Sequence, residues 1–211
     1  AHLEGEVEWI LVFRNVRSAV YLRDNERNRE NLDRVAAYYQ AEGVPFDWVH
    51  GFDAERVLWS APEWAFRHGV APSHLRSIQS SLQSRLPAER WSGQAELARL
   101  YALLGRYESA IQLDRQRLRA APTAENVRQR LVWSLLRLGR FDEADQEAEA
   151  LRTEAGPMGL TRATANTARA AQEAVTREEA VRRVIRLPLL TPNEIKHITR
   201  RFRVAEPRER R

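Results

Sequence analysis

The histidines are the first side chains to test for metal or acid–base chemistry. They are His2, His50, His68, His74 and His197. No two of them are four residues apart, and none stands in an HExxH sequence, the spacing that aims two imidazoles from one helix face at a zinc ion. Cysteine is absent, which excludes thiolate ligands and disulfides. The sequence therefore predicts no metal site and no cofactor.

Other groups capable of catalysis are present but are not arranged for it. The serines Ser77, Ser80, Ser81 and Ser84 are expected on a helix surface, with no general base placed beside them. The carboxylates Asp142, Glu143, Asp145, Glu147 and Glu149 share one predicted helix, where a solvated outer face with intrahelical ion pairs is the favoured interpretation. The glycines form neither a GxGxxG nor a GxxxxGK[ST] phosphate loop. We expect no catalytic residue and no enzymatic activity.

Positive charge is concentrated toward the C-terminus. The 211 residues include 34 Lys and Arg against 29 Asp and Glu, a net charge of +5. Residues 158–211 hold 13 basic and 6 acidic side chains, so the charges of the rest nearly cancel. A basic end suits nucleic acid, an anionic membrane or an acidic partner, but a solvated tail is the favoured interpretation, so we expect no nucleic-acid role. Its last arginines are Arg200, Arg201, Arg203, Arg208, Arg210 and Arg211.

Composition is typical of a folded protein, with 43% hydrophobic and 30% charged residues. No apolar run approaches the length of a membrane span, and no secretory signal is recognisable. Arginine replaces lysine almost everywhere, Lys196 being the exception, which is compatible with a GC-rich bacterial genome. The sequence is compatible with the bacterial cytoplasm, with the periplasm, and with the soluble part of a membrane-anchored protein.

One short sequence is written twice. LLGRYESA ends at Ala110 and LRLGRFDEA ends at Ala144, so Gly105 and Gly139 are 34 residues apart. The same shift aligns Leu97 with Leu131, Tyr101 with Leu135, and Leu104 with Leu138. Apolar residues at this spacing lie along one helix face, and a glycine after them permits the left-handed turn that ends a helix. The pattern predicts two helix pairs joined by tight turns.

This repeat resembles the tetratricopeptide repeat family over residues 92–157. The resemblance rests on the shared leucines, the Gly-Arg-aromatic triple and the alanine of the second helix, and Pro122 matches the closing proline of the family. It implies an all-α fold, an α-solenoid of antiparallel helix pairs. Some family positions are not matched: the early Trp falls at Gln94 and Arg128, the first Gly at Ala98 and Val132, and the second-helix aromatic at Asp114 and Ala148.

The flanking segments must complete the array, because two units cannot bury a solenoid face alone. Residues 58–91 are predicted to form a divergent helix pair, and residues 158–211 to form further helices with the basic tail. Capping sequences predict helix starts at Ser60, Thr176 and Thr191. Residues 1–57 are compatible with a divergent helical unit, which includes a helix over 31–43, or with a small βα element.

A rival interpretation starts from residues 7–50. Segments 7–13 and 46–50 have the composition of strands and 26–42 that of a helix, which would make a βαβ beginning. The stretch NLDRVAAYYQAEGVPFDWVHGFD also faintly resembles the opening of some sugar-nucleotide glycosyltransferases, and so implies the N-terminal part of an enzyme. From Ser60 onward the sequence predicts helices throughout, and it offers no acidic pair at a strand end to hold a metal and a diphosphate.

The tetratricopeptide resemblance implies a scaffold or adaptor that binds another protein within a bacterial multiprotein assembly. In the family the first helix of each unit lines the concave surface. The partner-binding residues so implied are Arg99, Ala102 and Leu103 in one unit, and Gln129, Trp133, Leu136 and Arg137 in the next. A peptide or helix with an apolar anchor and an acidic flank would suit Trp133 between Arg99 and Arg137. The alternative for Trp133 is a core position.

Overall fold

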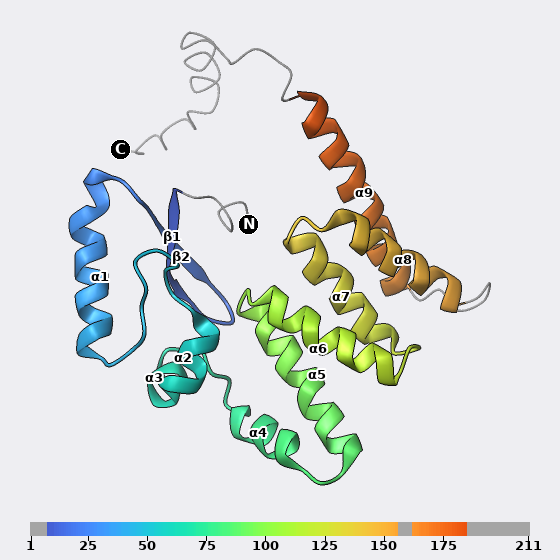
Figure 1. Ribbon diagram of the computed structural model, residues 1–211, viewed down its shortest axis with the longest axis horizontal. Coiled ribbons are helices and arrows are strands. Elements are labelled where there is room, and N and C mark those ends of the chain that lie inside the picture. The colour runs from blue at the N-terminus through green and yellow to red at the C-terminus, as the bar shows by residue number, and fades with distance from the viewer. Residues whose placement is uncertain (1–7, 156–161, 185–211) are drawn as a thin grey trace, which may run out of the picture.

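The computed structural model describes residues 8–155 and 162–184 of the chain. This part is mostly helical, as the sequence predicts, and begins with a two-stranded sheet (Figure 1). The elements in order are β1 (Trp9–Arg14), β2 (Ala19–Arg23), the 3-10 turn η1 (Glu26–Asn28), α1 (Arg29–Ala41), α2 (Ala54–Ser60), α3 (Pro62–Arg67), α4 (Leu75–Gln83), α5 (Pro87–Leu103), α6 (Tyr107–Ala120), α7 (Glu125–Arg137), α8 (Phe141–Ala155) and α9 (Arg162–Val184).

Strands β1 and β2 form an antiparallel hairpin. Alternate side chains of β1 are buried, namely Ile10, Val12 and Arg14, as expected for a strand with one covered face. Ile10 and Val12 pack with Leu32 of α1 in a small apolar cluster. The N-terminal region is therefore a βα element, one of the two alternatives that the sequence leaves open.

Residues 46–50 do not form the second strand of the predicted βαβ beginning. They lead into a tight loop in which the Asp47 carboxylate accepts hydrogen bonds from the backbone N–H groups of Val49 and His50, both at 2.7 Å. The loop closes through a single bridge between Asp47 and Gly51. An aspartate that caps its own turn in this way bends the chain where a strand would extend it. That prediction is therefore wrong.

Helices α3 and α4 lie within residues 58–91, where the sequence predicts a divergent helix pair. The predicted helix start at Ser60 is wrong, because Ser60 is the last residue of α2, where its hydroxyl donates to the Arg56 carbonyl oxygen at 2.7 Å, and α3 begins at Pro62. The cap of α2 is Asp53, whose carboxylate accepts from the N–H groups of Glu55 and Arg56. Helix α4 packs against α5, and the two approach closely at Gly93, where a Cβ would lie 2.9 Å from the Leu82 nitrogen.

The two predicted tight turns are confirmed. Gly105 and Gly139 have φ values of 73° and 71°, the left-handed conformation that glycine adopts without strain. The residue after each glycine donates its N–H to the carbonyl four residues before the glycine, Arg106 to Tyr101 at 2.8 Å and Arg140 to Leu135 at 3.0 Å. Helices α5 to α9 then pack in sequence order, α5 also contacts α7, and α7 also contacts α9.

Helix α9 runs without a break through the second predicted capping sequence. Thr176 lies inside the helix, and its hydroxyl donates to the Gln172 carbonyl oxygen at 3.0 Å, so it does not start a helix there. A threonine can bond back to the preceding turn as readily as it caps, which is why the sequence signal was ambiguous. The predicted helix start at Thr191 and the basic residues Arg200–Arg211 lie outside the described residues.

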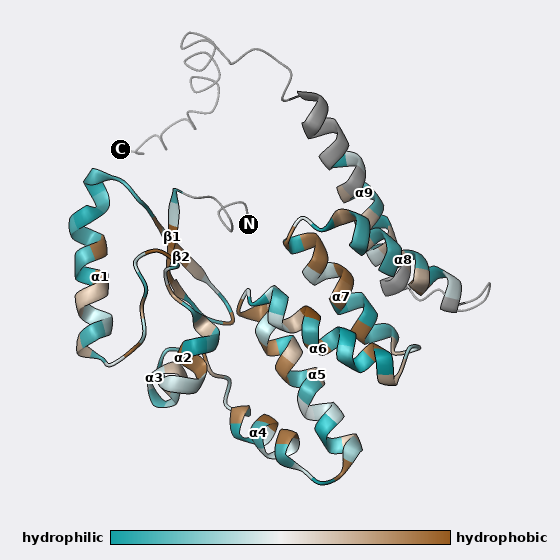
Figure 2. Cartoon of the chain, viewed as in Figure 1, coloured by the Kyte–Doolittle hydropathy of each residue, from teal (hydrophilic) through white to brown (hydrophobic). Residues whose placement is uncertain are grey.

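Most buried apolar residues belong to one of two large clusters. The first extends from Tyr39 to Ala110 and unites the N-terminal region with α4, α5 and the start of α6. The second extends from Ile111 to Ala171 and unites α6 to α9. Hydrophobic and hydrophilic residues alternate along these helices in Figure 2, as expected for helices with one buried face. The N-terminal region is thus part of the same core as the first helix pair.

Candidate partner-binding surface

Helix α7 carries four of the seven residues implied by the resemblance, of which Trp133 and Arg137 are exposed. Trp133 is 47% exposed, which rules out the alternative of a core position. Arg137 follows one turn later and is exposed, while Leu136 is half-buried against the second apolar cluster. Gln129, one turn before Trp133, donates from its amide to Glu125 at 3.1 Å. A large aromatic side chain thus stands in solvent with an arginine beside it.

Helix α5 supplies the other three implied residues. Arg99 is exposed and Leu103 is 52% exposed, whereas Ala102 is half-buried against the first apolar cluster. Within the described residues, the guanidinium groups of Arg99 and Arg137 have no acidic partner. Helices α5 and α7 contact each other.

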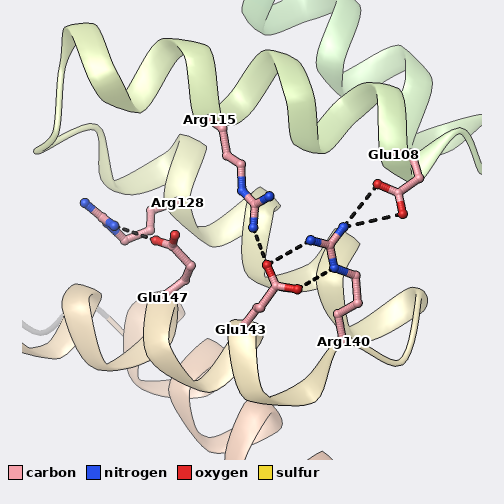
Figure 3. Close-up of polar contacts among 6 residues, drawn as sticks. All are labelled: Glu108, Arg115, Arg128, Arg140, Glu143 and Glu147. Carbon is pink, nitrogen blue, oxygen red and sulfur yellow. Dashed lines mark hydrogen bonds and ion pairs between the residues drawn. The ribbon is translucent and has the colours of Figure 1, made fainter.

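An ion-pair network connects α6 with α8 (Figure 3). Glu143 of α8 pairs with Arg115 of α6 and with Arg140 in the α7–α8 turn, and Arg140 also bonds Glu108 of α6 at 3.1 Å. The hydrogen bonds from Arg140 and Arg115 lower the pKa of Glu143 from 4.5 to about 2. The sequence predicts that the acidic residues of α8 form a solvated face with ion pairs inside the helix. This prediction is wrong for Glu143, because Glu143 also pairs with Arg115 of α6.

The same correction applies to Glu147, which pairs with Arg128 of α7 and is partly buried. Glu149 follows the expected pattern, since its partner Arg152 lies three residues later on α8, and Asp142 is exposed as expected. The sequence missed these pairs between helices because it does not show which arginines of α6 and α7 face α8. The acidic side chains of α8 therefore contribute to the attachment of the second helix pair.

A buried ion pair lies between α6 and α7. Asp114 is 0% exposed and accepts from the Arg130 guanidinium with both carboxylate oxygens, with distances to Nε of 3.2 and 3.0 Å. Burial raises the pKa of Asp114, and the hydrogen bonds from Arg130 oppose part of that rise. Asp114 stands where the tetratricopeptide family has an aromatic residue, so a charged pair replaces an apolar contact at this position.

The histidines of the described residues do not come together. His50 is within 3.1 Å of Asp47 in the exposed loop, and His68 stacks on Trp64 with ring centroids 4.0 Å apart. Within residues 8–155 and 162–184, no group of three or more His, Asp or Glu side chains could hold a metal ion. Ser80 donates to the backbone of its own helix, and Ser84 to Glu89. His2 and His197 lie outside the described residues.

The structure contains a pocket of about 370 Å³ that the sequence does not predict. It lies where the N-terminal hairpin meets the ends of α5 and α7, and we call it the junction pocket. Its described lining residues are Trp9, Leu11, Arg14, Tyr21, His50, Phe52, Ala54, Leu104, Gly105, Arg106, Tyr107, Arg137 and Leu138. The sequence offers no signal for it, because the pocket joins residues more than 100 positions apart.

No helix of the described part of the chain has the length and apolar character needed to cross a lipid bilayer. Comparison of the sequence and fold with family models, with curated proteins and with solved structures gave no match.

Proposed function

We propose that the chain is a non-enzymatic, tetratricopeptide-like scaffold that binds a peptide or helix of another protein along α5 and α7. The helix order supports an α-solenoid, because each helix from α5 to α9 packs on the next and α7 also contacts both α5 and α9. The turns at Gly105 and Gly139 have equal backbone geometry at the spacing of the repeat. The arginine-rich composition favours a bacterial assembly.

The observation that carries the proposal is the exposure of Trp133. Burying a tryptophan side chain in water-excluded contact is worth about 1.5–3 kcal/mol, so a tryptophan left 47% exposed on a rigid helix is a strong anchor for a partner. Leu103 adds a second exposed apolar side chain on the neighbouring helix. The partner therefore presents an apolar side chain toward α7.

The arginines of α5 and α7 indicate which charged groups the partner carries. Arg137 lies one turn after Trp133, and Arg99 occupies the position on α5 that corresponds to Trp133 itself, 34 residues earlier. Two guanidinium groups beside an apolar anchor favour a carboxylate on the bound chain, because arginine pairs with carboxylates through two parallel hydrogen bonds. We propose a partner segment with an apolar anchor flanked by acidic residues.

The test is peptide selection against the full chain. Peptides displayed on phage should converge on a large apolar residue next to aspartate or glutamate, and the Trp133→Ala variant should bind the selected peptide about 30-fold more weakly, or roughly 2 kcal/mol. The variant should melt nearly as the unmodified protein does, because surface substitutions change stability by about 0.5 kcal/mol or less.

Trp91→Ala is the matched control. Trp91 is 40% exposed near the start of α5, more than two turns before Arg99, and the Arg117 guanidinium of α6 lies 4.6 Å from its ring centroid. Its removal should leave the peptide affinity unchanged. Equal loss in both variants, or selected peptides without an apolar anchor, would contradict the proposal. A large drop in melting temperature for Trp133→Ala would contradict the assignment of Trp133 to the surface.

A further inference from the structure

We infer that a second pocket, between β1, α1 and α3, binds a small, uncharged, hydrocarbon-like molecule. We call it the aromatic pocket. Its volume of about 320 Å³ falls at the lower end of the range for small-molecule sites, which run from about 300 to 1,000 Å³. It shares no described lining residue with the junction pocket. A ligand of up to three rings fits this space.

The most deeply buried lining residues come from all three elements. They are Val12 of β1, Tyr39 of α1 and Trp64 of α3, which are 3–5% exposed. The pairing of β1 with β2 shifts register between Leu11 and Phe13, which places Val12 in a bulge. The Tyr39 hydroxyl donates to the Val12 carbonyl oxygen at 2.7 Å. Both oxygens are therefore already used in a hydrogen bond.

The polar atoms of Tyr38, Trp64 and His68, which also line the pocket, are paired with one another. Trp64 donates from Nε1 to the Tyr38 hydroxyl at 3.3 Å, and that hydroxyl lies 3.4 Å from His68 Nε2. His68 Nδ1 lies 2.9 Å from the Trp64 carbonyl oxygen. Because a carbonyl oxygen only accepts, Nδ1 carries the hydrogen of the neutral imidazole, and Nε2 accepts from Tyr38. Each nitrogen and hydroxyl of these three side chains thus has a partner.

These pairings determine the class of ligand. A polar or charged group buried beside these side chains would lose its hydration without gaining a hydrogen bond, which is unfavourable. The lining also includes Arg34, but this side chain is mostly exposed and pairs with Glu30 on the same helix, so it lies at the rim. Apolar surface, by contrast, gains free energy when it leaves water for such a pocket. The ligand is therefore uncharged and apolar.

The test is a fluorescence titration of the full chain with N-phenyl-1-naphthylamine, an uncharged dye, beside its anionic analogue 8-anilinonaphthalene-1-sulfonate. The uncharged dye should bind saturably at one site and at least about tenfold more tightly than the sulfonate. Naphthalene should displace it at about tenfold lower concentration than 2-naphthoate, which has the same rings and a carboxylate. Equal binding of the two dyes, or equal competition by the two naphthalenes, would overturn the inference.

Tyr38 and Phe66 provide matched variants that locate the site. Both side chains are exposed, by 44% and 60%, but Tyr38 lines the pocket and Phe66 does not. Tyr38→Ala should weaken binding of the uncharged dye at least about fivefold, whereas Phe66→Ala should leave it unchanged. Circular dichroism and melting verify that both variants fold. The inference fails if Tyr38→Ala binds as the unmodified protein does, or if Phe66→Ala or Trp133→Ala loses the dye.

Tyr38→Phe tests the pairing of the polar atoms and keeps the ring in place. It removes the hydroxyl that Trp64 Nε1 and His68 Nε2 contact, so both nitrogens become available to a ligand. The affinity of 1-naphthol relative to naphthalene should therefore rise at least about threefold in this variant, because the naphthol hydroxyl can pair with either nitrogen. An unchanged ratio would show that these hydrogen bonds do not select the ligand, and would overturn the inference.

Discussion

The two glycine turns of the helical array have the same backbone but different surroundings. Gly105 and Gly139 differ by only 2° in φ, 73° against 71°. A Cβ at Gly105 would overlap the Arg14 guanidinium, whereas a Cβ at Gly139 would meet only the Phe141 ring, at 3.9 Å. The repeat therefore determines the turn, and the N-terminal hairpin determines what the first turn contacts. Glycine is required for conformation at both positions and for space at one.

The two helix pairs also differ in the contacts that attach their second helices, α6 and α8, to the neighbouring helices. In α6, Asp114 is buried in an ion pair with Arg130, while the corresponding residue of α8 is Ala148, which is buried in the second apolar cluster. Exposed charges connect α8 to α6 instead, through Glu143 and its arginines (Figure 3). Residues 114 and 148 correspond in the two helix pairs, but the first is a charged side chain in an ion pair and the second is an apolar side chain in the core.

The largest effect is expected at Asp114. Asp114→Ala would leave the Arg130 guanidinium partly buried without its carboxylate, which should lower the free energy of unfolding by about 3–5 kcal/mol. Urea unfolding measures this. Asp142→Ala, on the exposed side of α8, is the control and should cost about 0.5 kcal/mol or less. Joint replacement of Asp114 by Leu and Arg130 by Met should recover most of the loss, and a loss that persists would show that the charge pair is not the cause.

The next effect separates the two turns. Gly139→Ala should cost about 1 kcal/mol, because a side chain is strained at positive φ. Gly105→Ala should cost about 2 kcal/mol or more, since the buried Arg14 guanidinium must also move. Thermal unfolding of both variants is the measurement. In an Arg14→Ala background the two costs should become equal; if the difference survives there, Arg14 does not distinguish the turns.

The smallest effect concerns pH. The pKa of Glu143 is lowered to about 2 in the folded protein, so its contribution to stability is present above its ordinary value of 4.5 and disappears as the pH falls from there toward 2. Glu143→Gln should reduce the loss of stability over that interval and leave the α5 side of the molecule unaffected. Melting temperatures at pH 5 and pH 3 measure the change. Parallel pH profiles for both proteins would contradict the role of this network.

The repeat part of the fold could be predicted because its signals are local. Gly105 ends a helix whose apolar stripe precedes it directly, and the same is true of Gly139. Strand β2 had no such signal, since Ala19–Arg23 shows no alternation of buried and exposed residues. Ser60 and Thr176 were misread because a hydroxyl that bonds back to the preceding turn has the same sequence context as a cap.

The candidate sites also differ in how far the sequence predicts them. The sequence left Trp133 open between the surface and the core, because buried residues surround it on the helix; the structure shows it 47% exposed between the buried Val132 and Ser134. The junction pocket could not be predicted, because it requires the hairpin to lie against the end of α7. The charge network was missed for a similar reason, since pairing between Arg115 and Glu143 depends on how α6 and α8 are placed.

The first apolar cluster has a consequence for how the chain acquires its structure during synthesis. It joins Tyr39 to Ala110, so the aromatic side chains of the N-terminal region cannot be covered until α5 and the start of α6 have left the ribosome. At roughly 5–20 residues per second, that interval is about 4–14 seconds. The second cluster needs mainly neighbouring helices and closes quickly once they are made. The hairpin side chains that pack against this cluster, Leu11 and Phe13, are therefore translated early and fully covered late, whereas Ile10 and Val12 are covered once α1 forms.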